Sequence, residues 1–291
     1  MRASCAGALH NVANEADQTI SALSVDAATG AIASVAPPAT IGLPPYAIAG
    51  TSDKKYLYVA NGGSKDVSAF TVYPGSGALT TVPGSPFAAG TNPRALALFG
   101  STLVVANAGS SDLSVYSVES TGIPKPLSPA SYATGAGPSA MVTWPGYNSV
   151  LLAAGSNDIS MFWIGPGGLE QSAGSRYPSG GSVSSLAFGR GTALYLYAAN
   201  AASGAATISG FNFNSLAGAG GELTSLPGFP YALPSCNSIV ADQTGAYLYA
   251  TAGTNLFGYS IDQGWLRFFG QISTSVKWIL NRLGFQDQSE G

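Results

Sequence analysis

The chain alternates apolar with small polar residues over short stretches, and this pattern predicts β-strands. Lys55–Asn61 alternates with a period of two and is followed by the pair Gly62-Gly63 and a second alternating run, Val67–Val72. Alternation of this kind, bounded by glycine, is typical of two antiparallel strands joined by a turn. The segment therefore predicts a β-hairpin.

This hairpin recurs along nearly the whole chain. Copies of its second strand begin at residues 20, 67, 113, 159, 208 and 256, at spacings of 46 to 49 residues. In four copies the preceding strand ends in Ala-Asn, at 13–14, 60–61, 106–107 and 199–200. We place Gly155 and Thr251 at the corresponding position of the other two copies. A repeat of this length lies at or slightly above the range of β-propeller blades.

Two further strands complete each repeat. A turn glycine precedes the third strand in every copy, at positions 30, 77, 122, 168, 221 and 264. A glycine-rich link and usually a proline then lead to a short strand rich in Ala and Ser, as from Phe87 through Pro93 to Leu96. Small side chains suit the crowded strand nearest the axis of a propeller. We predict an all-β propeller of four-stranded blades, with six repeats visible; a parallel solenoid is the weaker alternative, because its coils are usually shorter.

We assign residues 1–270 to a single propeller domain, with essentially no helix, and 271–291 to a C-terminal tail. Two interpretations of the tail stay open. The spacing of its apolar residues from Ile272 to Leu283 would suit a short amphipathic helix. Alternatively, Ser275–Leu280 follows the last copy where an innermost strand belongs, and the first copy has none before it. Pairing this segment with Leu9–Asn14 would close the ring.

Composition narrows the classes of partner. Only 9% of the residues are charged, and the net charge of -3 arises without basic clusters, so we expect no nucleic-acid binding. The sequence has no uninterrupted run of about 18 apolar residues, so it predicts no transmembrane helix. A surface polar through Ser, Thr, Asn and Gly favours export to the periplasm or cell exterior, with any leader absent from this chain. We also expect a monomer. A cytoplasmic location is the alternative.

The two cysteines, Cys5 and Cys236, are too few for a disulfide framework. They are either separate small core residues or one bridge.

Several motifs resemble a known family. Tyr56–Asn61 and Tyr195–Asn200 resemble the Tyr-Val-Thr-Asn-type repeats of bacterial propellers. With Asp26–Gly30 before the third strand and Gly84–Phe87 after it, the repeat resembles the lactonase family of seven-bladed propellers, which includes 6-phosphogluconolactonase. The resemblance extends from Leu9 to about Arg267. Only six copies are visible, so the chain is either a six-bladed relative or part of a seven-bladed one.

The resemblance implies lactone hydrolysis by charged and imidazole side chains at the central mouth. The chain has a single histidine, His10, within the first strand of the first copy, where a structural role is more common than a catalytic one. No Ser-His-Asp set and no nucleophile elbow can be assembled around it. The acids that recur before the second strand, Asp66, Asp112 and Asp158, favour turn-shaping through backbone N–H groups over a metal site. We expect no metal and no other cofactor.

Arg94 is the charge that stands out. It follows Pro93 at the start of an innermost strand, where we align Ala47, Ser139, Ser184 and Ser238 in other copies. A guanidinium there can hold a carboxylate or phosphate; the alternative is that it only caps a loop at the channel rim. By repeat register, the neighbouring candidates for a ligand pocket are Asn92, Tyr46, Cys236 and Asn237.

Two functions follow from these residues. The first is a non-enzymatic binding or scaffold module that offers the channel mouth to a small anionic ligand or a protein. The second is a metal-independent lactonase acting on a sugar lactone such as 6-phosphogluconolactone. In that case Arg94 would hold the anion, and an acid or His10 would handle the proton.

Overall fold

A computed structural model describes residues 8–26, 28–41, 44–144, 150–165, 168–172, 175–190, 194–201, 206–214, 222–242 and 244–273. Within these ranges every regular element is a β-strand, and all paired neighbours are antiparallel, which confirms the predicted fold class. The described part contains no helix long and apolar enough to cross a membrane.

The strands form six sheets, which we call blades 1 to 6 in chain order. Blade 1 contains β1 (Ala8–Asn14), β2 (Thr19–Val25) and β3 (Ile32–Thr40). Blade 2 contains β4 (Pro45–Gly50), β5 (Tyr56–Asn61), β6 (Asp66–Val72), β7 (Leu79–Thr81) and β8 (Phe87–Ala88). Blade 3 contains β9 (Pro93–Phe99), β10 (Thr102–Asn107), β11 (Asp112–Val118) and β12 (Pro124–Ala133).

Blade 4 contains β13 (Ala140–Trp144), β14 (Val150–Ala154), β15 (Asp158–Gly165), β16 (Gly168–Gln171) and β17 (Tyr177–Pro178). Blade 5 contains β18 (Val183–Arg190), β19 (Leu194–Asn200), β20 (Ala206–Asn214), β21 (Glu222–Ser225) and β22 (Tyr231–Leu233). Blade 6 contains β23 (Ser238–Ala241), β24 (Tyr247–Ala252), β25 (Asn255–Asp262) and β26 (Trp265–Ser273). In blades 2, 4 and 5 the outermost strand is interrupted, so that two short strands pair with the same inner neighbour.

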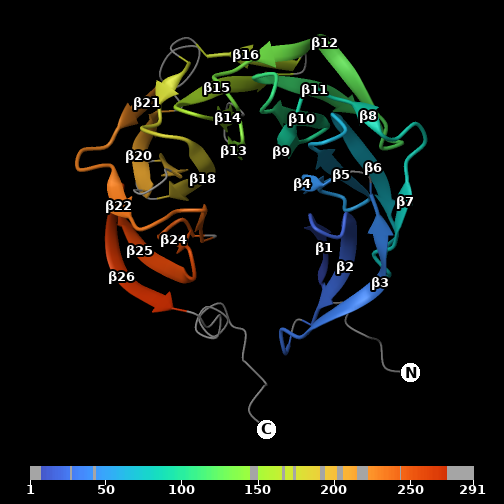
Figure 1. The fold of residues 1–291 in the computed structure, drawn as a ribbon, viewed down its shortest axis with the longest axis horizontal. Coiled ribbons are helices and arrows are strands. Elements are labelled where there is room, and N and C mark those ends of the chain that lie inside the picture. Colours follow the sequence, from blue (N-terminus) through green and yellow to red (C-terminus); the bar gives the residue numbers. More distant parts are fainter. Residues whose placement is uncertain are drawn as a thin grey trace.

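The blades are arranged around a common centre, as in a propeller. Figure 1 shows β4, β9, β13 and β18 nearest the centre and β3, β7, β12 and β26 at the periphery. Each of the five blades after the first therefore begins with its innermost strand, as the Ala- and Ser-rich segments predicted. Blade 1 has three strands and begins with β1, which lacks an inner neighbour among the described strands.

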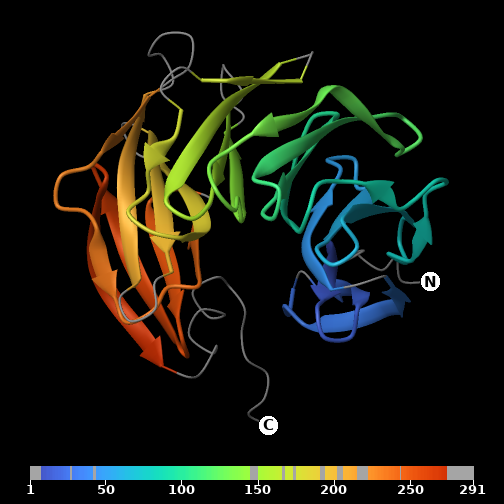
Figure 2. The same ribbon diagram turned by 45° about the horizontal axis from the view of Figure 1, so that its top comes forward.

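The described blades form an arc with blades 1 and 6 at its two ends (Figures 1 and 2). Apolar side chains are exposed on both end blades, with Val12 at 43% and Val240 at 60%. Strand β26 continues to Ser273, so residues 271–273, which we had assigned to the tail, pair with β25. The proposed closing segment Ser275–Leu280 and the rest of the tail lie outside the described residues.

The core lies between neighbouring blades. Tyr58 and Val59 follow one another in β5 and are both 0% exposed. Tyr58 packs in a cluster with Leu103 of blade 3, whereas Val59 packs with Ile20 of blade 1. Because consecutive side chains of a strand point to opposite faces, a strand between two blades needs apolar residues at nearly every position. This explains the dense apolar run that ends in Ala-Asn.

The recurring asparagine bridges the hairpin with its amide. The Nδ2 group of Asn61 donates to Asp66 Oδ1 at 2.7 Å and to Ser68 Oγ at 2.8 Å, and Asn107 repeats this pattern in blade 3. Asp66 and its equivalent thus accept a bond from the asparagine side chain, not from the backbone N–H groups that we expected. No group of three or more metal-binding side chains gathers within the described ranges.

The two variant copies differ at this position. In blade 4, Gly155 replaces the asparagine, and the Oδ1 atom of Asp158 is buried without a hydrogen-bond partner. In blade 6, Ala252 pairs with Asn255, so Ala252 stands at the asparagine position. Our placement of Thr251 there was one residue too early, because the turn that follows in this blade is shorter.

Candidate functional site at the start of the innermost strands

Arg94 lies in a β-bulge at the start of β9, where this strand begins to pair with β10. Pro93 pairs with Asn107 and Ala95 pairs with Ala106, so Arg94 has no partner of its own on β10. The same irregularity isolates Tyr46 in β4 and Ser184 in β18. A bulge turns one side chain out of the regular alternation, and bulges often lie beside functional sites.

The ladder corrects our alignment of the repeats. Tyr46, not Ala47, is equivalent to Arg94 in blade 2. In blade 6 the equivalent is Asn237 and not Ser238, because the backbone N–H of Asn237 bonds to Thr251 as that of Ser139 bonds to Ala154. We call these equivalent positions the rim residues: Tyr46, Arg94, Ser139, Ser184 and Asn237. All five stand where an innermost strand begins, and so at the same end of the blades.

Three rim residues contact the next blade. The hydroxyl of Ser139 donates to the Val183 carbonyl oxygen at 2.7 Å, and that of Ser184 donates to the Cys236 carbonyl oxygen at 3.3 Å. Tyr46 contacts Arg94 itself, with Cζ of the arginine 3.8 Å from the centre of the tyrosine ring. The two serine hydroxyls are therefore engaged by the backbone, whereas Tyr46 supports a charged group.

The guanidinium of Arg94 is held on two sides and open on the rest. Its Nε donates to Asn92 Oδ1 at 3.2 Å, while its central carbon, Cζ, lies over the ring of Tyr46. Asn92 has a φ of 54°, a left-handed conformation that asparagine tolerates better than most residues. Within the described part of the chain, the terminal nitrogens of Arg94 have no hydrogen-bond or ion-pair partner. They are available to a planar anion as a pair of donors.

Gly62 provides the space for this arrangement. A Cβ atom at position 62 would lie 2.1 Å from Cε2 of Tyr46 and 3.0 Å from Oδ1 of Asn92. Any side chain there would displace the two residues that orient Arg94. The sequence showed Gly62 only as half of a Gly-Gly turn, and nothing in the repeat pattern pointed to its contact with Tyr46.

The structure brings together three of the predicted ligand-binding residues, Arg94, Asn92 and Tyr46. Asn237 lies at the same end of the blades and is exposed, but no hydrogen bond between described residues joins it to these three. Cys236 is 1% exposed and packs in the core between blades 5 and 6. Burial raises the pKa of its thiol to about 11, so the group is protonated and a poor nucleophile at neutral pH. Cys5, its possible disulfide partner by sequence, lies outside the described residues.

His10 is separate from this cluster. It is exposed on β1, where it pairs with Leu23. Measured from the hairpin turn, it stands at the position of the leucines in the other blades, among them Leu57 and Leu103. It is four residues from Asn14 at the rim end of β1, a distance of roughly 13 Å along a strand. Within the described ranges, no hydrogen bond joins it to Arg94.

Comparison with known proteins agrees with this architecture. Residues 6–137 match the model of the family described as lactonase, 7-bladed β-propeller. No curated protein sequence matches the chain. A Desulfotomaculum acetoxidans protein of unknown function is 17% identical, with a TM-score of 0.70 over 91% of this chain and 80% of that one.

Two further structures show how widely this fold is used. A periplasmic gluconolactonase of Pseudomonas aeruginosa is 16% identical, with a TM-score of 0.72 over 88% of this chain and 78% of that one. A hydrazine synthase of Kuenenia stuttgartiensis is 18% identical, with a TM-score of 0.62 over 94% and 88%. At such identities the likeness establishes the fold and not the activity. The chain is a β-propeller that resembles the lactonase family.

Proposed function

We propose that this propeller binds a small anionic molecule at the rim, with the guanidinium of Arg94 as its main contact. The observation that carries the proposal is the support of Arg94 by Tyr46 on one side and Asn92 on another. Both contacts leave the terminal nitrogens available. Because the side chain is already oriented, less conformational entropy is lost when a carboxylate or phosphate binds.

The surrounding charges favour the same class of ligand. The described residues contain three ion pairs, Lys55 with Asp53, Lys125 with Glu119 and Arg267 with Asp262, and Arg94 belongs to none of them. The other rim residues are a phenol, two hydroxyls and an amide. Arg94 is therefore the positive charge of the rim in a chain whose net charge is -3. Such a site should bind an anion in preference to a neutral or positively charged ligand.

Titration calorimetry with gluconate and 6-phosphogluconate tests the proposal. We expect Arg94→Ala to weaken binding roughly ten- to a hundredfold, since a charge-assisted bidentate contact contributes about 1.5–3 kcal/mol. Arg94→Lys should give an intermediate affinity, because it keeps the charge and loses the planar pair of donors. Arg267→Ala is the matched control, since it removes one arginine charge from a distant strand. An affinity within twofold of wild type in Arg94→Ala would refute the anion site.

Hydrolysis of a sugar lactone is the second candidate function. The match of residues 6–137 to the lactonase family and the gluconolactonase among the similar structures favour it. In that reaction water adds to the lactone carbonyl, the ring C–O bond breaks, and a proton passes to the departing oxygen. Among the described residues, no carboxylate or imidazole makes a hydrogen bond or ion pair with Arg94, Asn92 or Tyr46. For this reason we place binding before catalysis.

Acid release from 6-phosphogluconolactone and from glucono-δ-lactone, measured against spontaneous hydrolysis, decides between the two candidates. A lactonase would exceed the spontaneous rate and lose at least tenfold in kcat/KM in Arg94→Ala. His10→Asn would abolish turnover if His10 handles the proton. A rate equal to the spontaneous one, together with binding of gluconate, would support the binding function and contradict the lactonase.

A further inference from the structure

Tyrosines close the space between sheets at two blade interfaces. Tyr58 in β5 is buried, and its hydroxyl donates to the carbonyl oxygen of Gly122 in blade 3 at 2.9 Å. Tyr197 in β19 is equally buried and donates to the carbonyl oxygen of Gly264 in blade 6 at 2.9 Å. Both glycines lie in the turn before the outermost strand. The aromatic ring thus fills the interface, and its hydroxyl forms a hydrogen bond to a turn of the next blade.

Asn11 stands at the equivalent position of blade 1. Asn14 pairs with Thr19 as Asn61 pairs with Asp66, and counting back three residues gives Asn11 in one blade and Tyr58 in the other. The same count gives the following residues in blades 3 to 6: Val104, Leu152, Tyr197 and Tyr249. Asn11 is shorter than a tyrosine and carries no ring. Its Nδ2 atom is buried and has no hydrogen-bond partner.

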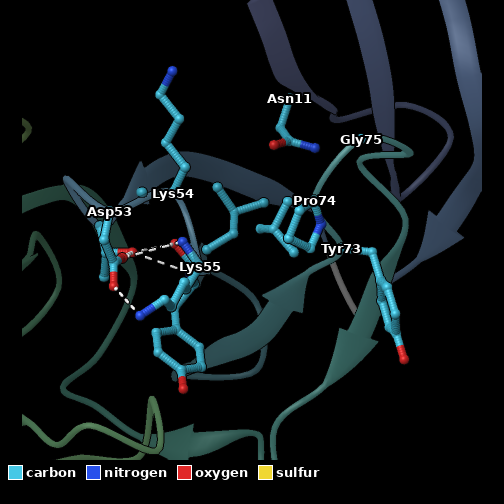
Figure 3. Close-up of a pocket in the computed structure, with 12 residues that line it drawn as sticks. Asn11, Asp53, Lys54, Lys55, Tyr73, Pro74 and Gly75 are labelled. Atoms are coloured by element: carbon cyan, nitrogen blue, oxygen red, sulfur yellow. Dashed lines mark hydrogen bonds and ion pairs between the residues drawn. The ribbon is translucent and has the colours of Figure 1, made fainter. Parts of the chain in front are cut away.

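A cavity of about 460 Å³ lies beside Asn11, between blade 1 and two turns of blade 2. Figure 3 shows the Asn11 amide across from two turns, one with Asp53–Lys55 and the other with Tyr73–Gly75. Leu57 and Val72 add apolar lining. The volume is within the range of small-molecule sites, which is about 300–1,000 Å³.

This cavity is distinct from the rim. Gly50, which lines the cavity, is the last residue of β4, whereas Tyr46 is the second residue of the same strand. The two sites therefore lie at opposite ends of the blade. Asp53 is paired with Lys55 at 3.2 Å, so this carboxylate is already neutralised at the cavity wall.

We propose that the cavity binds a small aromatic molecule that carries a hydrogen-bond-accepting oxygen. A flat ring is the shape that fills the same space at the interfaces of Tyr58 and Tyr197. The acceptor would pair with Asn11, whose Nδ2 has no partner and almost no accessible surface, so that a rotation of the amide would bring this donor to the oxygen of the ligand. Leu57 and Val72 would contact the ring.

Titrations of the whole chain with p-cresol and with toluene test the proposal. These probes share one ring and differ in the oxygen, so we expect p-cresol to bind about five- to tenfold more tightly. Asn11→Leu should remove this difference by weakening p-cresol alone. Asn11→Tyr should abolish binding of both probes and raise the Tm, because the new ring would occupy the cavity. Val12→Thr, on the opposite face of β1, should bind both probes as wild type does.

Three results would overturn the proposal: no binding of p-cresol at millimolar concentration, unchanged binding in Asn11→Tyr, or equal affinity for 4-methylcyclohexanol, which lacks the flat ring. Should Asn11→Tyr fail to fold, the ratio of p-cresol to toluene affinity in Asn11→Leu decides. Binding of gluconate should be the same in every Asn11 variant, since that site is at the other end of the blade. The two sites can thus fail independently.

Discussion

The centre of the Tyr46 ring lies 3.8 Å from Cζ of Arg94, although the two residues begin the innermost strands of different blades. A cation over an aromatic face gains about 0.5–1 kcal/mol at an exposed site. The contact also restricts an otherwise mobile arginine. Orientation of the charge therefore depends on how blade 2 packs beside blade 3.

Removal of the Tyr46 ring should weaken the anion site without changing its charge. We expect Tyr46→Ala to lower the affinity for gluconate about two- to fivefold, and Tyr46→Phe to stay within twofold because it keeps the ring face. Titration calorimetry measures both. Equal affinities in the alanine variant and wild type would mean that Arg94 does not need this support.

Gly62→Ala should disturb both stability and binding. The added methyl group would meet the Tyr46 ring at 2.1 Å, and such overpacking costs about 1–3 kcal/mol. Urea unfolding gives the loss of stability, and titration with gluconate gives the loss of affinity. Gly50→Ala is the matched control on β4, since its nearest neighbouring atom, the carbonyl oxygen of Tyr56, is 3.7 Å away. Comparable losses in both variants would contradict a specific role for Gly62.

Sequence periodicity predicted the features that repeat. Strand alternation, turn glycines and the Ala-rich innermost strands follow from local rules, and each copy reinforced the others. The site depends on departures from the repeat. A bulge shifts the ladder by one residue without changing the alternation nearby, so Ala47 was aligned where Tyr46 belongs.

Contacts made by turns, and contacts between blades, could not be predicted from the sequence either. The approach of Gly62 to Tyr46 joins a turn to the bulge of β4 within blade 2, and no sequence spacing indicates it. The burial of Cys236 depends on residues of both blades 5 and 6. The donor to Asp66 could have been predicted, because a regular hairpin places Asn61 directly opposite Asp66.

Loss of the hairpin asparagine should destabilise the fold markedly. Asn107 is 0% exposed and donates to Asp112 at 2.8 Å and Ser114 at 2.9 Å. We expect Asn107→Ala to lower the free energy of unfolding by about 2–3 kcal/mol, since two acceptors lose their donor. Urea denaturation measures the change. The exposed Asn157→Ala should remain within about 0.5 kcal/mol of wild type, and a similar value for Asn107→Ala would show that the amide is dispensable.

Stability should fall in alkaline solution because of the buried tyrosines. Burial raises the pKa of Tyr197 above its ordinary value of 10.0, so the folded state favours the neutral phenol. This contribution is complete below about pH 10 and declines as the pH rises toward the higher folded value. The slope of the unfolding free energy between pH 10 and 11.5 should be shallower in Tyr197→Phe, by up to about 1.4 kcal/mol per pH unit. Tyr73→Phe, at a 58% exposed position, is the control.

The last prediction concerns closure of the ring. Blade 1 has three strands, and the inner edge of β1 has no partner among the described strands. Exposed edges are normally covered, because unpaired backbone groups invite association. We expect Ser275–Leu280 to pair with β1 and supply the missing innermost strand. Because Gln271–Ser273 already pair within blade 6, the deletion that tests this begins at residue 274.

Deletion of residues 274–291 should then cause a large loss of unfolding cooperativity in urea, since it would remove the strand that we expect to pair with the inner edge of β1. Deletion of residues 284–291 alone is the matched control and should leave the midpoint unchanged, because it spares the pairing segment. The competing interpretation, a detached helix in the tail, requires both deletions to behave like the full chain. Equal midpoints and slopes for all three chains would therefore exclude closure by Ser275–Leu280.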